Sequence, residues 1–274
     1  MPHYHNLRAS WASQGPQGVV TRGTTGFNRL RRSDRWLRYH LDVQRLLWHA
    51  EAPLAIDIGY GASFTTTVEW ARWLRQIRPD ITVTGVEIEP SRVLPPRDGV
   101  TFELGGFEMA GHSPHLARAF NVLRQYDAAD VEDAWREVTS RLTPGGLFLE
   151  GTCDEIGRRA AWVLLDASGP RTLTLAWDPF GAERPSDIAE RLPKVLIHRN
   201  IPGEPIHALL TAADRAWDIS AGWAPHGPRV RWRKALELLA DDAPVARPRR
   251  NIRDNVLTVP FGFVAPEYEQ GWTG

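Results

Sequence analysis

Apolar and polar positions follow two different rhythms between residues 51 and 152. Short apolar runs of strand length alternate with stretches in which apolar residues recur at helical spacing. The predicted strands lie at 54–59, 81–87, 100–104, 116–123 and within 142–152, and the predicted helices at 65–78 and 127–142. Apolar strands that alternate with helices are typical of an open sheet covered on both faces. We therefore predict an α/β fold with a doubly wound, mostly parallel sheet.

The regions on either side of this core have other patterns. Residues 33–50 fit one amphipathic helix that begins at Ser33. RAAWVLLD at 159–166 and RTLTLAWD at 171–178 are separated by the turn ASGP, which predicts an antiparallel hairpin at the end of the sheet. Further helices are predicted at 185–192, 204–217 and 229–240, with Trp217, Trp223 and Trp232 in the core.

These patterns divide the chain of 274 residues into three parts. Residues 1–50 form an N-terminal arm and helix, 51–180 form the core, and 181–274 form helical additions that pack on it. Within the arm, residues 1–26 are rich in Gly, Gln, Ser and Thr without periodicity, which predicts a loose or ligand-ordered terminus.

A formal net charge of zero conceals an uneven distribution of charge. Residues 1–50 hold eight Arg against two acids, a net charge of +6, whereas residues 51–151 hold nine basic and fifteen acidic residues, a net charge of −6. A basic arm before an acidic segment suggests that the arm either folds back over the body or contacts an anionic ligand. The total excludes a uniformly basic nucleic-acid binder.

The cellular setting follows from features that the chain lacks. Cys153 is the only cysteine, so neither an internal disulfide nor a cysteine-rich zinc site can form. The N-terminal residues have no apolar stretch of signal-peptide type, and about 18 consecutive apolar residues occur nowhere. We expect a cytoplasmic protein without a membrane partner.

The first predicted strand-to-helix turn carries the strongest chemical signal. LAIDIG at 54–59 is followed by Tyr60, Gly61, Ala62 and Ser63. Gly59 and Gly61 permit a tight turn and close approach of a ligand to the backbone. Glu87, at the tip of the next strand, can accept hydrogen bonds from both hydroxyls of a ribose. The dinucleotide fingerprint GxGxxG is absent because Phe64 stands at its last glycine. The alternative is an ordinary glycine turn with an exposed glutamate.

Asp57, two residues before the first glycine, gives this turn a more specific pattern. Acid-x-Gly-x-Gly-x-small resembles motif I of the class I S-adenosylmethionine-dependent methyltransferases. GVEIEP at 85–90, Gly105–Phe107 after the third strand, Asn121 after the fourth and the LTPGG turn at 142–146 are similar to later elements of that family in the same order. The resemblance covers about residues 54–152.

The resemblance implies S-adenosyl-L-methionine as cofactor, no metal, and a Rossmann-like methyltransferase fold. It implies that the acid and the glycine loop bind the methionyl end, that Glu87 holds the ribose, and that the third-strand tip surrounds the adenine. The implied cofactor-binding residues are Asp57, Gly59, Tyr60, Gly61, Ser63, Glu87, Ile88, Gly106, Phe107 and Asn121.

Side chains that could assist catalysis follow the fourth and fifth strands. Tyr126 comes after Asn121, Arg124 and Gln125, where the family sets substrate-facing groups, but it fits a packed aromatic equally well. Asp154 and Glu155 lie just after the fifth strand as candidate bases, and their alternative is a polar turn beside Arg158 and Arg159. His112 and His115 could suggest a metal site, but no third ligand accompanies them, and Cys153 fits a small buried residue.

The arm is predicted to act as a lid over the cofactor, with Thr24, Thr25, Asn28 and Arg29 contacting the ligand. Methyl transfer to an O, N or C nucleophile of a small molecule is the predicted function. Two alternatives stay open at this point. One is a noncatalytic nucleoside-binding or interaction protein with the same fold, and the other is a methyltransferase that acts on RNA or protein through the basic arm.

Overall fold

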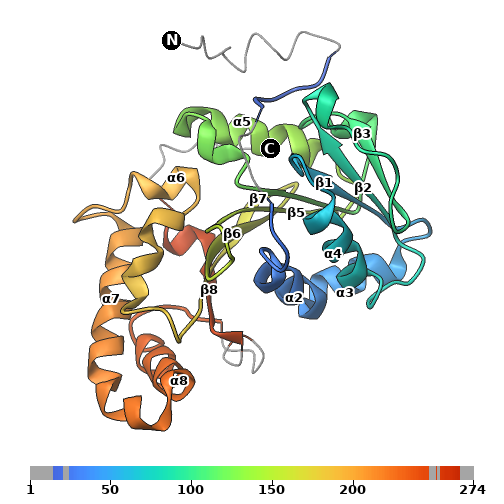
Figure 1. Cartoon of the computed structure of the whole chain (residues 1–274). Helices are drawn as coiled ribbons and strands as arrows, with labels where there is room; N and C mark the ends of the chain where they lie inside the picture. The colour runs from blue at the N-terminus through green and yellow to red at the C-terminus, as the bar shows by residue number, and fades with distance from the viewer. Residues whose placement is uncertain (1–14, 21–24, 247–250, 252–253, 266–274) are drawn as a thin grey trace.

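An eight-stranded sheet organises the described part of the chain in the order β3-β2-β1-β4-β5-β6-β7-β8 (Figure 1). The computed structural model describes residues 15–20, 25–246, 251 and 254–265. The strands are β1 (Leu54–Ile58), β2 (Thr82–Glu87), β3 (Val100–Leu104), β4 (Leu116–Phe120), β5 (Leu147–Cys153), β6 (Arg159–Asp166), β7 (Gly169–Trp177) and β8 (Val256–Pro260). Neighbours among β1–β5 pair in parallel, and the pairs from β5 to β8 are antiparallel. The predicted α/β fold with a mostly parallel core and a C-terminal hairpin is confirmed.

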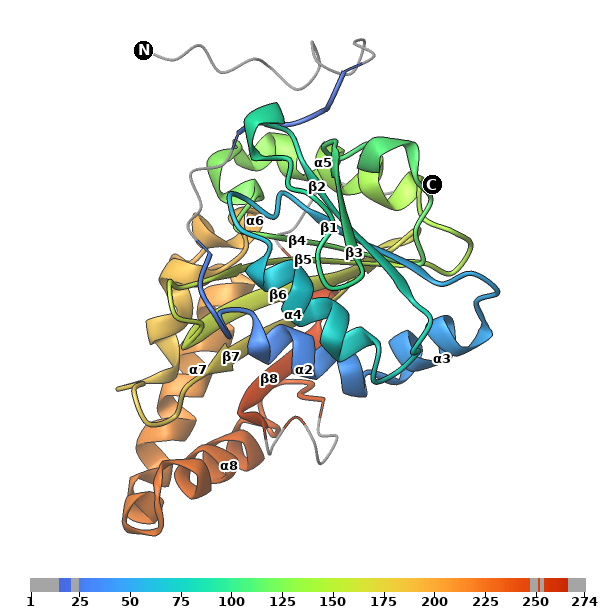
Figure 2. The same ribbon diagram turned by 45° about the vertical axis from the view of Figure 1, so that its right-hand side comes forward.

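Helices cover both faces of the sheet (Figures 1 and 2). The α-helices are α2 (Arg31–Tyr39), α3 (Leu41–His49), α4 (Thr65–Leu74), α5 (Ala128–Ser140), α6 (Lys194–Ile197), α7 (Pro205–Ile219) and α8 (Pro228–Leu239). The 3-10 helices include η3 (Leu123–Gln125) and η4 (Pro185–Arg191). Buried residues of α2, α3 and α4 pack against one face, and those of α5, η4, α6, α7 and α8 belong to the cluster on the other. None of the helices in the described ranges is both long and apolar enough to cross a bilayer.

The single helix predicted over 33–50 is wrong, because the structure breaks it at His40. His40 has an extended backbone (φ −74°, ψ 122°), so α2 ends before it and α3 begins after it. The side chain of Gln44 donates a hydrogen bond to the carbonyl of Arg38 and satisfies one free group at the end of α2. The apolar stripe continues through the break, which is why its periodicity did not reveal the boundary.

Residues 181–274 are predicted to be helical, but the structure forms one strand there, β8. β8 pairs antiparallel with β7, from Thr172 opposite Pro260 to Ala176 opposite Val256. Its partner lies about 80 residues away, as in the 84-residue separation of the hydrogen-bonded Thr174 and Thr258. Trp217 and Trp232 are buried as predicted, but Trp223 is 44% exposed.

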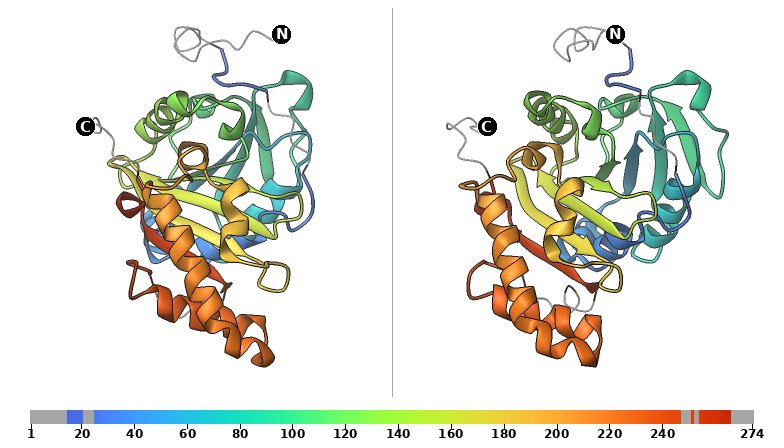
Figure 3. Two further views of the ribbon diagram at one scale, coloured as in Figure 1. Left: turned by 90° about the vertical axis from the view of Figure 1, so that its left-hand side faces the viewer. Right: turned by 60° about the vertical axis from the view of Figure 1, so that its left-hand side comes forward.

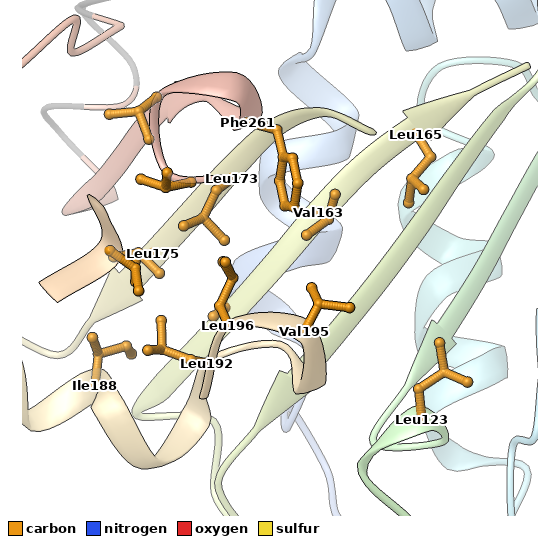
Figure 4. Close-up of a cluster of buried hydrophobic side chains, with 14 of the residues drawn as sticks. Leu123, Val163, Leu165, Leu173, Leu175, Ile188, Leu192, Val195, Leu196 and Phe261 are labelled. Carbon is orange, nitrogen blue, oxygen red and sulfur yellow. The ribbon is translucent and has the colours of Figure 1, made fainter. Parts of the chain in front are cut away.

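Apolar side chains fill the layer between the antiparallel strands and η4–α6 (Figure 4). Leu173 and Leu175 of β7 face Ile188, Leu192 and Leu196 in this cluster. Figure 3 shows α7 and α8 packed beside this end of the sheet. The antiparallel extension is therefore held on the parallel core by one continuous hydrophobic layer, and the carboxyl ends of β1–β5 are left for the loops.

Candidate functional site

The predicted glycine turn lies at the carboxyl ends of the parallel strands. Gly59 and Gly61 have φ of +67° and +82°, which an L side chain rarely adopts. A Cβ on Gly59 would also lie 2.7 Å from Cγ2 of Val122, which follows β4. Glycine is thus required at residue 59 both by the backbone and by its neighbour. In an open parallel sheet this edge is where ligands bind.

Glu87 closes the glycine turn against the end of β2. Its side chain is fully buried, and Oε2 accepts a hydrogen bond from the Gly61 amide at 2.9 Å. Oε1 accepts from the amides of Ile88 at 3.1 Å and Glu89 at 3.3 Å. The carboxylate therefore ties two loops of the predicted site together and retains acceptor capacity on Oε2.

Two residues of the predicted turn use their side chains for structural contacts. The hydroxyl of Tyr60 donates to the carbonyl of Arg92, and its ring packs against Phe102 with centroids 4.8 Å apart. The Oγ of Ser63 lies 2.8 Å from Oγ1 of Thr65 and accepts from the Thr65 amide at the start of α4. Tyr60 and Ser63 can therefore offer a ligand mainly their backbone.

Asp57 lines the turn but its carboxylate is bonded on the protein side. Arg118 on β4 donates to it from Nε and Nη2, each at 2.8 Å, and Thr67 donates at 2.7 Å. Arg118 also donates to Asp34 at 2.6 Å, and its guanidinium lies 4.3 Å from the centre of the Trp70 ring. Arg118 and Asp34 were not predicted as functional, although an arginine inside the apolar strand LARAF is a signal of a buried partner.

The two acids of this cluster differ in their surroundings. Burial raises the pKa of Asp34 to about 7, although Arg118 lowers it. Its Oδ2 is buried and makes no hydrogen bond. Asp34 is therefore the member of the cluster that takes up a proton near neutral pH, while Asp57 carries the bidentate pair with Arg118.

A segment of the arm, residues 15–20, lies across the tips of β2 and β3, and we call it the strap. The backbone amide of Gln17 donates a hydrogen bond to Oε2 of Glu108 at 2.7 Å, and the backbone carbonyl of Gln17 accepts one from the Phe107 amide at 3.0 Å. A Cβ on Gly106 would meet the Gln17 oxygen at 1.8 Å, so only glycine allows this approach. Gly18 is next to Ile88 and Phe107.

The strap fills most of the space between these tips. The remaining cavity has a volume of about 20 Å³ and is lined by the strap together with the predicted residues Gly59, Glu87, Ile88, Gly106, Phe107 and Tyr126. The Tyr126 hydroxyl accepts a hydrogen bond from the Val19 amide, and burial raises the pKa of Tyr126. Tyr126 is a buried donor or acceptor in this arrangement, with little capacity to act as a base near neutral pH.

A second cavity, of about 40 Å³, lies beside the glycine turn, and we call it the glycine-loop cavity. It is lined by Thr25, Arg29, Leu30, Asp57, Gly59, Tyr60, Gly61, Thr66, Phe120 and Asn121. Asn121 has a positive φ of 60°, accepts from the Cys153 amide at 2.9 Å and donates to its sulfur at 3.3 Å. Of the predicted lid residues, Thr25 and Arg29 reach this cavity, Asn28 bonds Glu69 through its backbone, and Thr24 lies outside the described residues.

A third cavity, of about 310 Å³, follows β5, and we call it the arginine-lined cavity. It is lined by Asp154, Glu155, Ile156, Arg158, Arg159, Asp178, Gly181, Ala182 and Arg191. Asp154 accepts hydrogen bonds from the amides of Ile156, Arg158 and Arg159 at 2.8 to 3.3 Å, so it organises the turn. Glu155 is exposed in the cavity wall. Asp154 therefore serves the polar turn, as the alternative interpretation predicts. Of the two acids, Glu155 is the one whose side chain is free to act as a base.

The two histidines have structural partners. Nε2 of His112 lies 2.9 Å from Glu103, and Nδ1 of His115 accepts from the Leu54 amide at 3.4 Å. Within the described ranges, three or more His, Cys, Asp or Glu side chains nowhere gather in a way that could hold a metal ion. Cys153 is 1% exposed, as its predicted role of a small buried residue requires.

No family model matches the sequence, and no curated protein matches it. Among solved structures the chain is similar to the sugar N-methyltransferase KedS8 from Streptoalloteichus sp ATCC 53650, with 16% identity, a TM-score of 0.34, and coverage of 58% of this chain and 80% of that one. It is also similar to the magnesium protoporphyrin IX methyltransferase ChlM from Synechocystis PCC 6803 with bound S-adenosylmethionine, at 14% identity and TM-score 0.33, covering 48% and 65%.

The CMeT domain of the citrinin polyketide synthase is similar over 37% of this chain at 20% identity and a TM-score of 0.32. The chain spans 29% of the length of that protein and 65% of the magnesium protoporphyrin IX methyltransferase, less than two thirds of each. The strand order β3-β2-β1-β4-β5 gives the chain a class I methyltransferase-like fold. The sheet continues antiparallel through β6, β7 and β8.

Proposed function

We propose that this protein transfers a methyl group from S-adenosyl-L-methionine to an O, N or C nucleophile of a small molecule. One observation carries the proposal. The glycine turn, Glu87, the Gly105–Phe107 tip and Asn121 come from four different parallel strands and meet at one carboxyl edge of the sheet. Convergence of this kind at strand ends is the usual arrangement of a nucleoside-binding site in such sheets.

The polar groups at this edge fit the cofactor in kind. Glu87 would hold the ribose hydroxyls, and the backbone of Gly59–Gly61 would hold the methionyl end. The Phe107 amide and the Glu108 carboxylate offer a donor beside an acceptor, which matches N1 and the 6-amino group of adenine. Gln17 of the strap now fills that donor–acceptor pair.

The size of the two cavities bears on how a cofactor would enter. Volumes of about 20 and 40 Å³ compare with several hundred Å³ for a site that holds a small molecule. The strap would therefore have to leave its place between Ile88 and Phe107 for the adenosyl group to bind. Three hydrogen bonds join its backbone to the Glu108 carboxylate, the Phe107 amide and the Tyr126 hydroxyl, and Val19 packs against the core, so these contacts must be exchanged for those of the cofactor.

The proposed reaction needs no covalent bond between the protein and the methyl group. When bound, the cofactor supplies an electrophilic methyl group on a sulfonium, and transfer needs the nucleophile in line with the carbon–sulfur bond. The chain's residues would position the two partners and exclude water, and Asn121 and Arg29, which line the glycine-loop cavity, would contribute to both. Glu155 is the side chain that could accept a proton from a neutral acceptor.

Calorimetry with S-adenosylmethionine and S-adenosylhomocysteine tests the proposal. The expected result is one binding site per chain, lost or weakened at least about tenfold in Glu87→Ala because the ribose acceptor is gone. Glu132→Gln, a change at a partly exposed residue of α5, serves as the control and should bind as the wild type does. Absence of binding by the folded protein, both full-length and without residues 1–20, would refute the proposal.

A noncatalytic protein with the same fold is the second candidate, and the filled site favours it. The strap occupies the position proposed for adenine, and the Asp57 carboxylate is hydrogen-bonded by Arg118 and Thr67. A protein of this kind would bind the nucleoside of the cofactor without transferring its methyl group. Binding of S-adenosylhomocysteine without methyl transfer to any acceptor in a broad panel would support it over the enzyme.

A further inference from the structure

The arginine-lined cavity shares a wall with the glycine-loop cavity. Arg29 lines the glycine-loop cavity, and its Nε donates to the carbonyl of Asp154 at 3.0 Å. Asp154 lines the arginine-lined cavity and directly follows Cys153, which is hydrogen-bonded to Asn121. The two cavities therefore lie on either side of Arg29 and the end of β5. A molecule in the larger one would sit beside the proposed methyl-transfer position.

The acids of the arginine-lined cavity make no close ion pair with its arginines. Over the part of the chain that the structure describes, no ion pair within 4.0 Å joins Asp154, Glu155 or Asp178 to Arg158, Arg159 or Arg191. Asp154 is bonded by three backbone amides, and Asp178 accepts from the amide of Phe180 at 3.2 Å. Two of the three carboxylates are thus already satisfied by backbone donors.

The three arginines and three acids that line this cavity balance in formal charge, but two of the arginine side chains have donors without an acceptor among the described residues. The side chain of Arg158 is exposed and makes no hydrogen bond or ion pair with the described residues. Nε of Arg191 is buried without a hydrogen-bond acceptor, and its nearest carboxylate oxygen, on Glu190, is 3.8 Å away. That same oxygen lies 3.2 Å from Arg159, so one glutamate serves two arginines. A buried donor without an acceptor is costly unless a ligand supplies one.

A fourth arginine lies close to this cluster. Arg124, in η3 after β4, donates from Nη1 to the backbone carbonyl of Glu190 at 2.9 Å. Burial lowers the pKa of Arg124, and the charge of Arg191 lowers it further. Arg124, Arg159 and Arg191 thus gather around a single acidic residue, Glu190, and such a cluster of guanidinium groups favours a bound anion.

We propose that the arginine-lined cavity binds an anionic group of the methyl acceptor, a carboxylate or a phosphate, through Arg158 and Arg191. This inference rests on the proposed methyl transfer for the identity of the ligand as an acceptor. Guanidinium groups match the geometry of both anions and bind them bidentately. A volume of about 310 Å³ corresponds to a small metabolite, since ligand cavities begin at roughly that size.

Calorimetric titration of the full chain with inorganic phosphate and with succinate, at constant ionic strength, tests the site. Arg191→Gln and Arg158→Gln should each weaken the tighter of the two anions at least about tenfold, because each removes a charged donor. Arg72→Gln is the matched control, since Arg72 is an exposed arginine on α4 with Asp98 as its partner. Unfolding curves in urea verify that all variants are folded.

The two anions distinguish the two possible groups on the methyl acceptor. Tighter binding of phosphate indicates a phosphate group, and tighter binding of succinate indicates a carboxylate. No saturable binding of either anion by the wild type, or equal binding by wild type and both arginine variants, overturns the proposal. S-adenosylhomocysteine is titrated into the same samples. If anions bind and S-adenosylhomocysteine binds neither the full chain nor the chain without residues 1–20, the methyltransferase proposal fails and the anion site stands; the reverse result removes only the anion site.

Discussion

The guanidinium of Arg118 donates two hydrogen bonds of 2.8 Å to the carboxylate of Asp57, and both side chains are buried. The pair joins the centres of β4 and β1, and Asp34 of α2 binds the remaining side of Arg118. Because Asp57 lies two residues before Gly59, the cluster holds the glycine turn on the sheet. The acid that resembles a cofactor ligand thus also holds the N-terminal helix on the sheet.

Replacing Arg118 should destabilise the fold strongly. In Arg118→Met two buried carboxylates lose their common partner, which costs about 3–5 kcal/mol of the free energy of unfolding. Arg72→Met breaks an ion pair whose side chains are 63% and 51% exposed and should cost less than about 1 kcal/mol. Urea unfolding followed by tryptophan fluorescence compares the two variants. Equal losses would mean that the cluster adds nothing beyond a surface pair.

Glu150 in β5 should make the folded state less stable at high pH. It is 1% exposed, neither carboxylate oxygen has a hydrogen-bond partner, and its sheet neighbours are Ala119 and Val163. Burial raises the pKa of Glu150 from 4.5 to about 8. The folded chain therefore holds a proton that the unfolded chain releases, and stability falls as pH rises from about 4.5 to about 8.

The variant Glu150→Gln removes this titration. The free energy of unfolding of Glu150→Gln minus that of the wild type should be near zero at pH 4. This difference should rise by a few kcal/mol between pH 4 and pH 9. Asp34, whose pKa is raised to about 7, has the same sign but is present in both proteins and cancels. A difference that is constant over this range would contradict the buried, unpaired state of Glu150.

The strap should detach when Gly106 acquires a side chain. Gly106→Ala places a Cβ 1.8 Å from the Gln17 oxygen, so the hydrogen bond from the Phe107 amide to Gln17 cannot form. Hydrogen exchange of the Phe107 amide should accelerate by about tenfold or more, because its acceptor is lost. Gly222→Ala, where a Cβ would meet no atom within 4 Å, is the control. Unchanged protection in Gly106→Ala would place the strap elsewhere in solution.

Deleting residues 1–20 should strengthen cofactor binding under the proposed function. The strap occupies the donor–acceptor pair of Phe107 and Glu108, so its removal frees the position proposed for adenine. The affinity for S-adenosylhomocysteine, measured by calorimetry, should rise severalfold because the cofactor no longer competes with the strap. A loss of affinity would instead identify the arm as a lid that closes over a bound cofactor.

Cys153 offers a probe of the folded site. It is buried between the end of β5 and Asn121, and burial raises the pKa of its thiol. As the only cysteine, it should react with a thiol reagent at least about 100-fold more slowly in the folded protein than in urea. Rapid reaction of the folded protein would mean that the wall between the two cavities opens.

Much of the fold could be predicted because its signals are local. The β3 prediction at 100–104 matches the structure, and the hairpin of β6 and β7 follows from two β-rich runs around a turn. The positive φ angles at residues 59 and 61 are consistent with the choice of glycine there. The break at His40 and the strand β8 were missed, since neither interrupts a local apolar pattern in a way that reveals its partner.

The sequence alone determined the order of the elements and the residues at the strand tips, because helical and strand periodicity and glycine turns are written in neighbouring residues. The tertiary structure decided which polar groups pair. Arg118 meets Asp34 across 84 residues and Asp57 across 61, and Gln17 meets Glu108 across 91. Such contacts depend on how distant segments pack, so only the folded chain shows that the motif acid is bonded internally and that the arm fills the proposed base position.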